Sequence, residues 1–106
     1  MAKFLLEANY TAEGLRGLMK DTATVREARI KEMLGAVSGK LDAMYFSVGK
    51  TDVFAICDLP DLATAASLAI AISASGVVTV RTTPLLTAPE TDAAIRKGVI
   101  YRPPGA

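Results

Sequence analysis

Residues 41–61 read LDAMYFSVGKTDVFAICDLPD, and this stretch decides the fold. It contains two segments, 41–48 and 52–57, that are rich in apolar, aromatic and β-branched residues, as strands are. The short connection between them includes Gly49, which can adopt a positive φ without steric cost, as hairpin turns require. A proline and Asp61 follow, and Asp61 can cap a helix. The stretch therefore predicts a β-hairpin followed by a helix.

A strand, a short helical turn and a longer helix are predicted before the hairpin. Residues 3–9 alternate loosely between the two sides of a strand, and residues 11–19 favour a short or bent helical turn that two glycines weaken. Thr24 and Glu27 form a capping box, with which the longer helix begins, and Gly39 ends it. Its apolar residues recur every three or four positions. Its charged residues are expected to face solvent: Arg26, Glu27, Arg29, Lys31 and Glu32.

A helix, a strand and a tail are predicted after the hairpin. The helix runs from Asp61 to about Ser75, and the β-branched segment 77–83 follows as the last strand. One more helical turn is favoured over 89–97, and the final residues have no pattern. We therefore divide the chain into a domain of residues 1–88 and a C-terminal helical turn and tail of residues 89–106.

The order of these elements is strand, helix, strand, strand, helix, strand, which predicts an α+β, ferredoxin-like βαββαβ fold. Its antiparallel four-stranded sheet would carry both helices on one face. The segment 53–57 is apolar on both sides, so the second face would also need cover. We expect a sheet-packed dimer, in which two sheets form a dimeric α/β barrel. The alternative is a monomer whose own residues 85–100 fold over this face.

Nearly all of residues 3–87 resemble the GYD domain family, which consists of small bacterial proteins in the dimeric α/β-barrel group. The matching features are Asn9-Tyr10-Thr11 with Gly14, Lys20-Asp21, Gly39-Lys40-Leu41, Gly49 with Asp52-Val53, and Leu59-Pro60-Asp61. One position departs from the motif that names the family, because Thr51 stands where tyrosine is usual. The resemblance implies the fold and the dimer, and it implies no settled biochemical activity.

The composition excludes several kinds of chemistry. The chain has 106 residues, no histidine and one cysteine, so it lacks a Ser-His or Cys-His pair, an imidazole-bound haem and a zinc site of nitrogen and sulfur ligands. We predict no metal and no cofactor. Twelve basic residues balance eleven acidic ones and form no run, which argues against nucleic acid and anionic membranes as partners.

The sequence also bears on the compartment. Its start, Met1-Ala2-Lys3-Phe4, lacks the pattern of a secretory signal, and a single cysteine fits a reducing environment. The uncharged stretch 62–80 is rich in small polar residues and is interrupted by Gly76, unlike a membrane span. We therefore expect a cytoplasmic protein.

Four residues are candidates for a ligand site: Asn9, Tyr10, Tyr45 and Asp52. We predict that they hold a small, mostly apolar molecule between sheet and helices. Asp52 could serve as a general base and a tyrosine as a proton donor, which would make the protein a cofactor-independent monooxygenase or isomerase. Asp52 could equally fix the hairpin, so whether the protein is an enzyme stays open, and no catalytic residue is assigned.

A third possibility is a structural module that forms a higher oligomer through the second helix. Thr64, Ser67, Ala71 and Ser75 occupy the face where a solvated helix normally carries charge. Two further residues have simple predicted roles. Cys57 is expected to be an inert core residue, and Arg81 is expected to pair with Glu7 across the sheet or to meet an anionic ligand.

Overall fold

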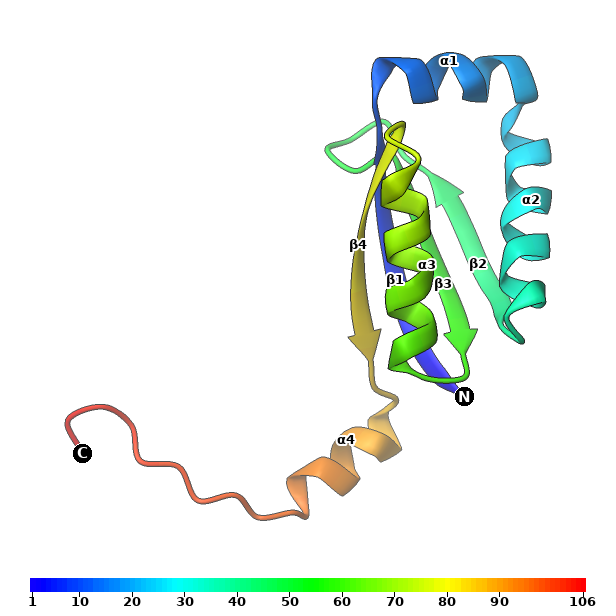
Figure 1. Cartoon of the computed structure of the whole chain (residues 1–106). Helices are drawn as coiled ribbons and strands as arrows, with labels where there is room; N and C mark the ends of the chain where they lie inside the picture. The colour runs from blue at the N-terminus through cyan, green and yellow to red at the C-terminus, as the bar shows by residue number, and fades with distance from the viewer.

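The computed structural model describes all 106 residues and confirms the predicted α+β, ferredoxin-like arrangement. A four-stranded antiparallel sheet has the order β2-β3-β1-β4 (Figure 1). Its strands are β1 (Ala2–Tyr10), β2 (Lys40–Phe46), β3 (Val53–Leu59) and β4 (Val78–Leu85). The two central strands, β1 and β3, are antiparallel neighbours, and their register places Phe4 opposite Cys57.

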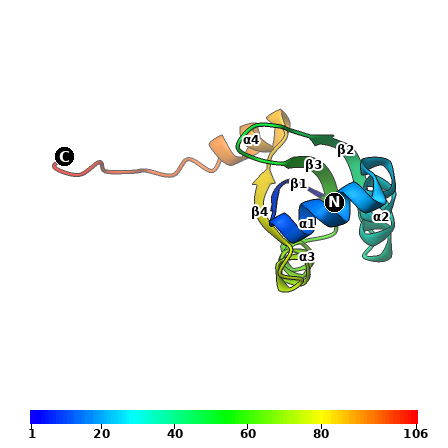
Figure 2. The ribbon, with the colours of Figure 1, turned by 90° about the horizontal axis from the view of Figure 1, so that it is seen from above.

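Two long helices cover one face of this sheet, as predicted. Figure 2 shows α2 and α3 on the same side of the strands, while α1 crosses the end of the sheet. The helices are α1 (Ala12–Asp21), α2 (Ala23–Ala36), α3 (Leu62–Ala74) and α4 (Ala88–Ile95). Asp61 caps α3 as expected, since its carboxylate accepts a hydrogen bond from the Thr64 backbone N at 2.8 Å.

The core lies between the sheet and these two helices. In β3, every second side chain from Val53 to Leu59 is buried, which is the period of a strand with one covered face. The core cluster comprises Phe4, Leu6, Leu34, Ala55, Cys57, Leu59, Ala65 and Leu68. Full burial of a large apolar side chain such as Phe4 contributes roughly 1.5–3 kcal/mol. The core therefore fixes α2 and α3 to one face.

The segment before the main helix differs from the prediction. A complete ten-residue helix, α1, replaces the expected short turn, and Gly14 in it is buried. A Cβ at Gly14 would lie 2.2 Å from the Val77 carbonyl oxygen, so the absence of a side chain lets α1 lie directly on the start of β4. The glycine that weakens the helix in isolation is thus required by its packing.

The predicted capping box at Thr24 is wrong, because the helix begins two residues earlier. Thr22 joins α1 to α2: its N–H donates to the Leu18 carbonyl at 2.8 Å, and its hydroxyl accepts from the Val25 N at 3.3 Å. To do both, Thr22 adopts φ 83° and ψ 155°, a conformation that is costly for a β-branched residue. A single residue, Thr22, turns the chain from one helix into the next (Figure 1).

The face of the sheet away from the helices, which we call the open face, is mixed rather than wholly apolar. Its centre is apolar, with Leu5, Ile56 and Phe54 half-buried. Two ion-pair groups flank this centre: Lys3 with Asp42 and Asp58, and Glu7 with Arg81 at 3.2 Å. The predicted apolar segment 53–57 does contribute to both faces of the sheet, and Asp58, just beyond it, adds a charge to the open face.

The chain does not cover its own open face. After Leu85 every residue is exposed, and Figures 1 and 2 show α4 and the tail extending away from the sheet. The alternative in which residues 85–100 fold back over the sheet is therefore not the arrangement observed.

Candidate functional site

A cleft opens between the helices and the sheet at the end of the molecule where α1 crosses. Its outer chamber has a volume of about 630 Å³ and is bounded by α1, α2, α3 and the start of β4. A smaller inner pocket of about 60 Å³ lies against the sheet. The two share Tyr10, Arg26, Met33, Ile72 and Val78, so they form one continuous space, which we call the helix–sheet cleft.

The two parts of the cleft differ in polarity. All but one of the twelve residues that line the inner pocket are hydrophobic, and they come from α2, α3 and all four strands. The outer chamber adds polar groups at its rim, among them Glu13 and Asp21 of α1. The depth of the cleft therefore suits an apolar group and its mouth a polar one.

Arg26 is the one charged residue that lines the inner pocket. It lies on α2 four residues before Ile30 and seven before Met33, so the helix period places it on the core-facing stripe. The prediction that Arg26 faces solvent is therefore wrong. Its side chain is half-buried beside an apolar space and takes part in no ion pair, although Glu13 and Asp21 line the same outer chamber.

Tyr10 is the second polar side chain that lines both chambers. It ends β1 on the same side as Phe4 and Leu6, facing the helices. Burial raises the pKa of the Tyr10 hydroxyl above its ordinary value, while the nearby Arg26 partly opposes this rise. At neutral pH Tyr10 is therefore a neutral hydroxyl that can donate or accept a hydrogen bond inside the cleft.

The structure brings only one of the four predicted site residues into this cleft. Asn9 lies on the open face, where its side-chain amide donates to the Lys50 carbonyl at 2.8 Å. Tyr45 lies on the open face as well, opposite Phe54 on β3, and is 70% exposed. Asp52 lines neither chamber, because its carboxylate accepts a hydrogen bond from the Tyr10 backbone N at 2.8 Å.

Strand geometry explains this separation. Successive side chains of a strand point to opposite faces, so Asn9 and Tyr10 cannot share a cleft. The alternation of residues 3–9 between the two sides of a strand already predicts that Asn9 and Tyr10 face opposite ways. The helical spacing of Arg26, Ile30 and Met33 is the signal by which Arg26 could have been found from the sequence.

Comparison with known proteins adds the family. The GYD domain pattern matches residues 4–95, which is more than half of the chain. The protein belongs to the GYD domain family. The predicted resemblance is thus confirmed, and the match includes α4. No curated protein and no solved structure matches this chain.

In this GYD domain, the residue that departs from the family motif has an identifiable contact. Thr51 is buried, and its hydroxyl accepts a hydrogen bond from the Arg81 guanidinium at 3.0 Å. The same guanidinium pairs with Glu7 at 3.2 Å, which confirms the predicted pairing. Thr51 therefore helps to hold Arg81 flat on the open face.

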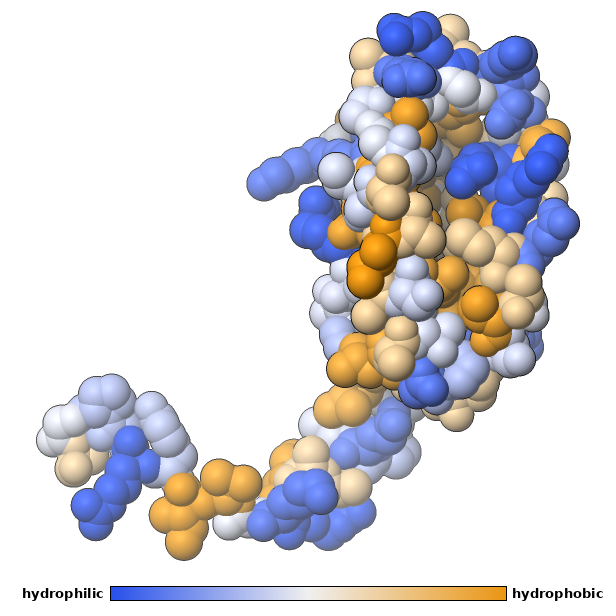
Figure 3. Space-filling view, viewed as in Figure 1, coloured by the Kyte–Doolittle hydropathy of each residue, from blue (hydrophilic) through white to orange (hydrophobic).

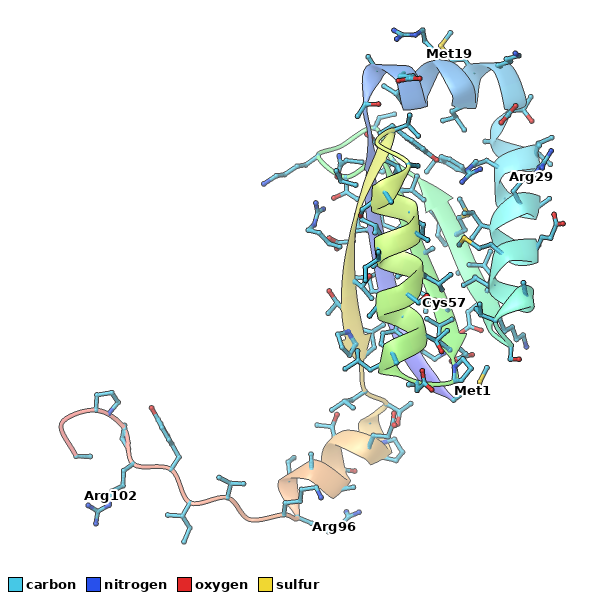
Figure 4. The ribbon with its side chains drawn as sticks, in the orientation of Figure 1. Met1, Met19, Arg29, Cys57, Arg96 and Arg102 are labelled. Carbon is cyan, nitrogen blue, oxygen red and sulfur yellow. The ribbon has the colours of Figure 1, made fainter.

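Cys57 of the GYD domain lies in the core beside α3, as Figure 4 marks. Burial raises the pKa of its thiol to about 11, and the negative charges of Asp58 and Asp42 add to the rise. The thiol is therefore protonated and unreactive at neutral pH, as expected for an inert core residue. No three potential metal ligands lie together in the chain, and no helix is both long and apolar enough to cross a membrane.

Proposed function

We propose that this GYD domain protein binds a small, mostly apolar molecule with one anionic group in the helix–sheet cleft. The observation that carries the proposal is the half-buried, unpaired Arg26 beside an apolar pocket. A positive charge in such a place is costly to leave without a partner, and an anionic group would supply one. Tyr10 would add a hydrogen bond to the same group.

The size of the cleft supports this function. Small-molecule sites usually measure about 300–1,000 Å³ and combine a mostly apolar lining with a few polar groups. The outer chamber, of about 630 Å³, falls in this range, and Arg26 and Tyr10 are the polar groups that both chambers share. An apolar tail would extend toward Met33 and Ile72, and the anionic end would stay at Arg26.

We also propose that the protein assembles as a homodimer through its open face. The apolar centre of that face, Leu5, Ile56 and Phe54, is only half-buried within one chain. Each of the neighbouring charged groups has an ion-pair partner within its own chain, Lys3 with Asp42 and Asp58 and Arg81 with Glu7, which lowers the cost of covering them with a second subunit. Sedimentation as a single subunit at micromolar concentration would contradict this part of the proposal.

The ligand part is tested with anilinonaphthalene sulfonate, a fluorescent probe that joins an apolar ring system to one anionic group. We expect Arg26→Gln to weaken probe binding about tenfold, because a hydrogen bond to a charged group contributes about 1.5–3 kcal/mol. Arg29→Gln is the matched control, since Arg29 is exposed on the outer side of the same helix (Figure 4). Equal affinities for the two variants would refute the assignment of Arg26.

Native mass spectrometry of the purified protein gives an independent readout. A small molecule retained in the cleft would appear as a mass above that of the chain. We expect this excess mass to be lost from Arg26→Gln and kept in Arg29→Gln.

A further inference from the structure

The last twenty-one residues, 86–106, form a segment that the rest of the chain does not contact closely, and we call it the C-terminal arm. All of its residues are exposed. The radius of gyration is 16.8 Å, whereas a compact domain of this length has about 13 Å. Figure 1 shows the cause, because the arm leaves the end of β4 and projects beyond the sheet.

The arm is too apolar for a free tail. Val99 and Ile100 are 86% and 94% exposed, and Leu86, Ile95 and Tyr101 are exposed as well. Figure 3 shows hydrophobic colour in the middle of the arm, between hydrophilic stretches, with no other part of the molecule beside it. Exposed apolar side chains that follow one another in this way mark an interaction surface.

The arm also contains ordered structure that it cannot stabilise alone. Helix α4 has a complete capping box, in which the Thr87 hydroxyl accepts from the Glu90 N and the Glu90 carboxylate accepts from the Thr87 N. It has only eight residues, none of them buried. Isolated helices of this length are marginal in water, so α4 needs a surface to lie on.

The position of the arm indicates which surface this is. Figure 2 shows α4 displaced to the side of the sheet opposite α3, which is the side of the open face. The four strands of seven to nine residues give the open face a projected area of roughly 500 Å². A stable interface takes about 800 Å² of accessible surface from each partner, and burial of the exposed apolar side chains of the arm would add to what the open face supplies. A second subunit that covers it would lie within reach of the arm.

We infer that the C-terminal arm of each subunit lies against a second copy of this chain, with Val99, Ile100 and Tyr101 buried by the partner. The inference rests on the proposed dimer through the open face and adds the segment that completes it. The partner that the arm contacts is a second copy of the chain, because the arm lies on the side of the open face. The proposed dimer covers that face with a second copy.

Photo-crosslinking tests which chain the arm contacts. p-Benzoylphenylalanine replaces Tyr101 in a tagged chain, which is mixed with untagged protein before irradiation. We expect tagged–untagged crosslinks whose mapped partner residues lie in the body of the other chain. The same photo-reactive residue at Arg29, on the outer side of α2, is the control and should give none. Crosslinks within one chain only would overturn the inference.

Sedimentation of full-length variants tests the energetic role of the arm. Val99→Ser with Ile100→Ser should weaken self-association by at least about tenfold, because two apolar side chains would no longer be removed from water by the partner. Pro103→Ser with Pro104→Ser, farther along the arm, should not. A dimer of unchanged affinity in the first variant would overturn the role of the arm and leave the sheet dimer standing. A monomeric wild-type chain would overturn both.

Discussion

At the residue scale, Gly14 and Gly17 stand three positions apart on α1 and have opposite surroundings. A Cβ at Gly14 would lie 2.2 Å from the Val77 oxygen, while a Cβ at Gly17 would meet nothing within 4 Å. We predict that Gly14→Ala lowers the free energy of unfolding by about 1–3 kcal/mol through overpacking. Gly17→Ala should raise it by about 0.5–1 kcal/mol, because alanine favours the helix.

Urea unfolding of the two variants measures these changes. A Gly14→Ala variant as stable as the wild type would mean that α1 does not lie against the start of β4 as described.

Cys57 predicts a dependence of stability on alkaline pH. Its thiol has a pKa of about 11 in the folded chain and an ordinary value of 9.0 when exposed. Between these values the unfolded chain has lost the proton that the folded chain keeps, so unfolding becomes more favourable as the pH rises. The stabilisation is complete below pH 9 and is lost progressively toward pH 11.

The variant Cys57→Ala isolates this effect, because every other titrating group is shared with the wild type. We expect wild-type stability to fall more steeply than that of Cys57→Ala between pH 9 and 11, measured as the urea midpoint. Parallel curves would show that the thiol is not protected from water.

At the element scale, the junction of α1 and α2 stores strain at a single residue. Thr22 has φ 83° and ψ 155°, a region that glycine occupies freely. We predict that Thr22→Gly stabilises the protein by about 1 kcal/mol, since relief of strain of about 1–3 kcal/mol exceeds the few tenths lost when glycine replaces threonine as cap. Thermal unfolding measures this gain. Thr24→Gly, inside α2, is the control and should destabilise instead.

The same elements illustrate how much can be predicted from the sequence. The hairpin, α3 and its Asp61 cap follow from local patterns, because turn residues and caps act within a few positions. The order of elements then predicts the sheet. Local helix propensity underestimates α1, because the benefit of Gly14 lies in its contact with residue 77, which is distant in sequence. A tertiary contact of this kind overrides helix propensity.

The candidate site was predicted less well for a related reason. Tyr10 was identified, but Asn9 and Tyr45 lie on the opposite face and Asp52 holds the backbone of Tyr10. The charged neighbours of Arg26 predict a solvated position for it, although its helical spacing puts it on the core side. For these residues the polar or charged side chain alone predicts the wrong surroundings. The position of each residue along its strand or helix indicates which face it occupies.

At the scale of the whole molecule, two surfaces compete as the site of assembly: the open face and the outer side of α3. We predict that Ile56→Lys, at the centre of the open face, weakens self-association more than about thirtyfold, because an interface would bury an unpaired charge. Ala66→Lys, on the exposed side of α3, should leave it unchanged. Sedimentation velocity over a range of concentrations measures both, and the reverse pattern would favour a module that assembles through α3.

The enclosed position of Cys57 has a practical consequence for measuring the assembly. Since the chain has no other thiol, a cysteine introduced at any exposed position would be the only one to take up a nitroxide reagent at neutral pH. Each subunit would then carry one unpaired electron without any change to the native residue at position 57. Pulsed dipolar spectroscopy on such a sample would return the spacing between equivalent points of two neighbouring chains.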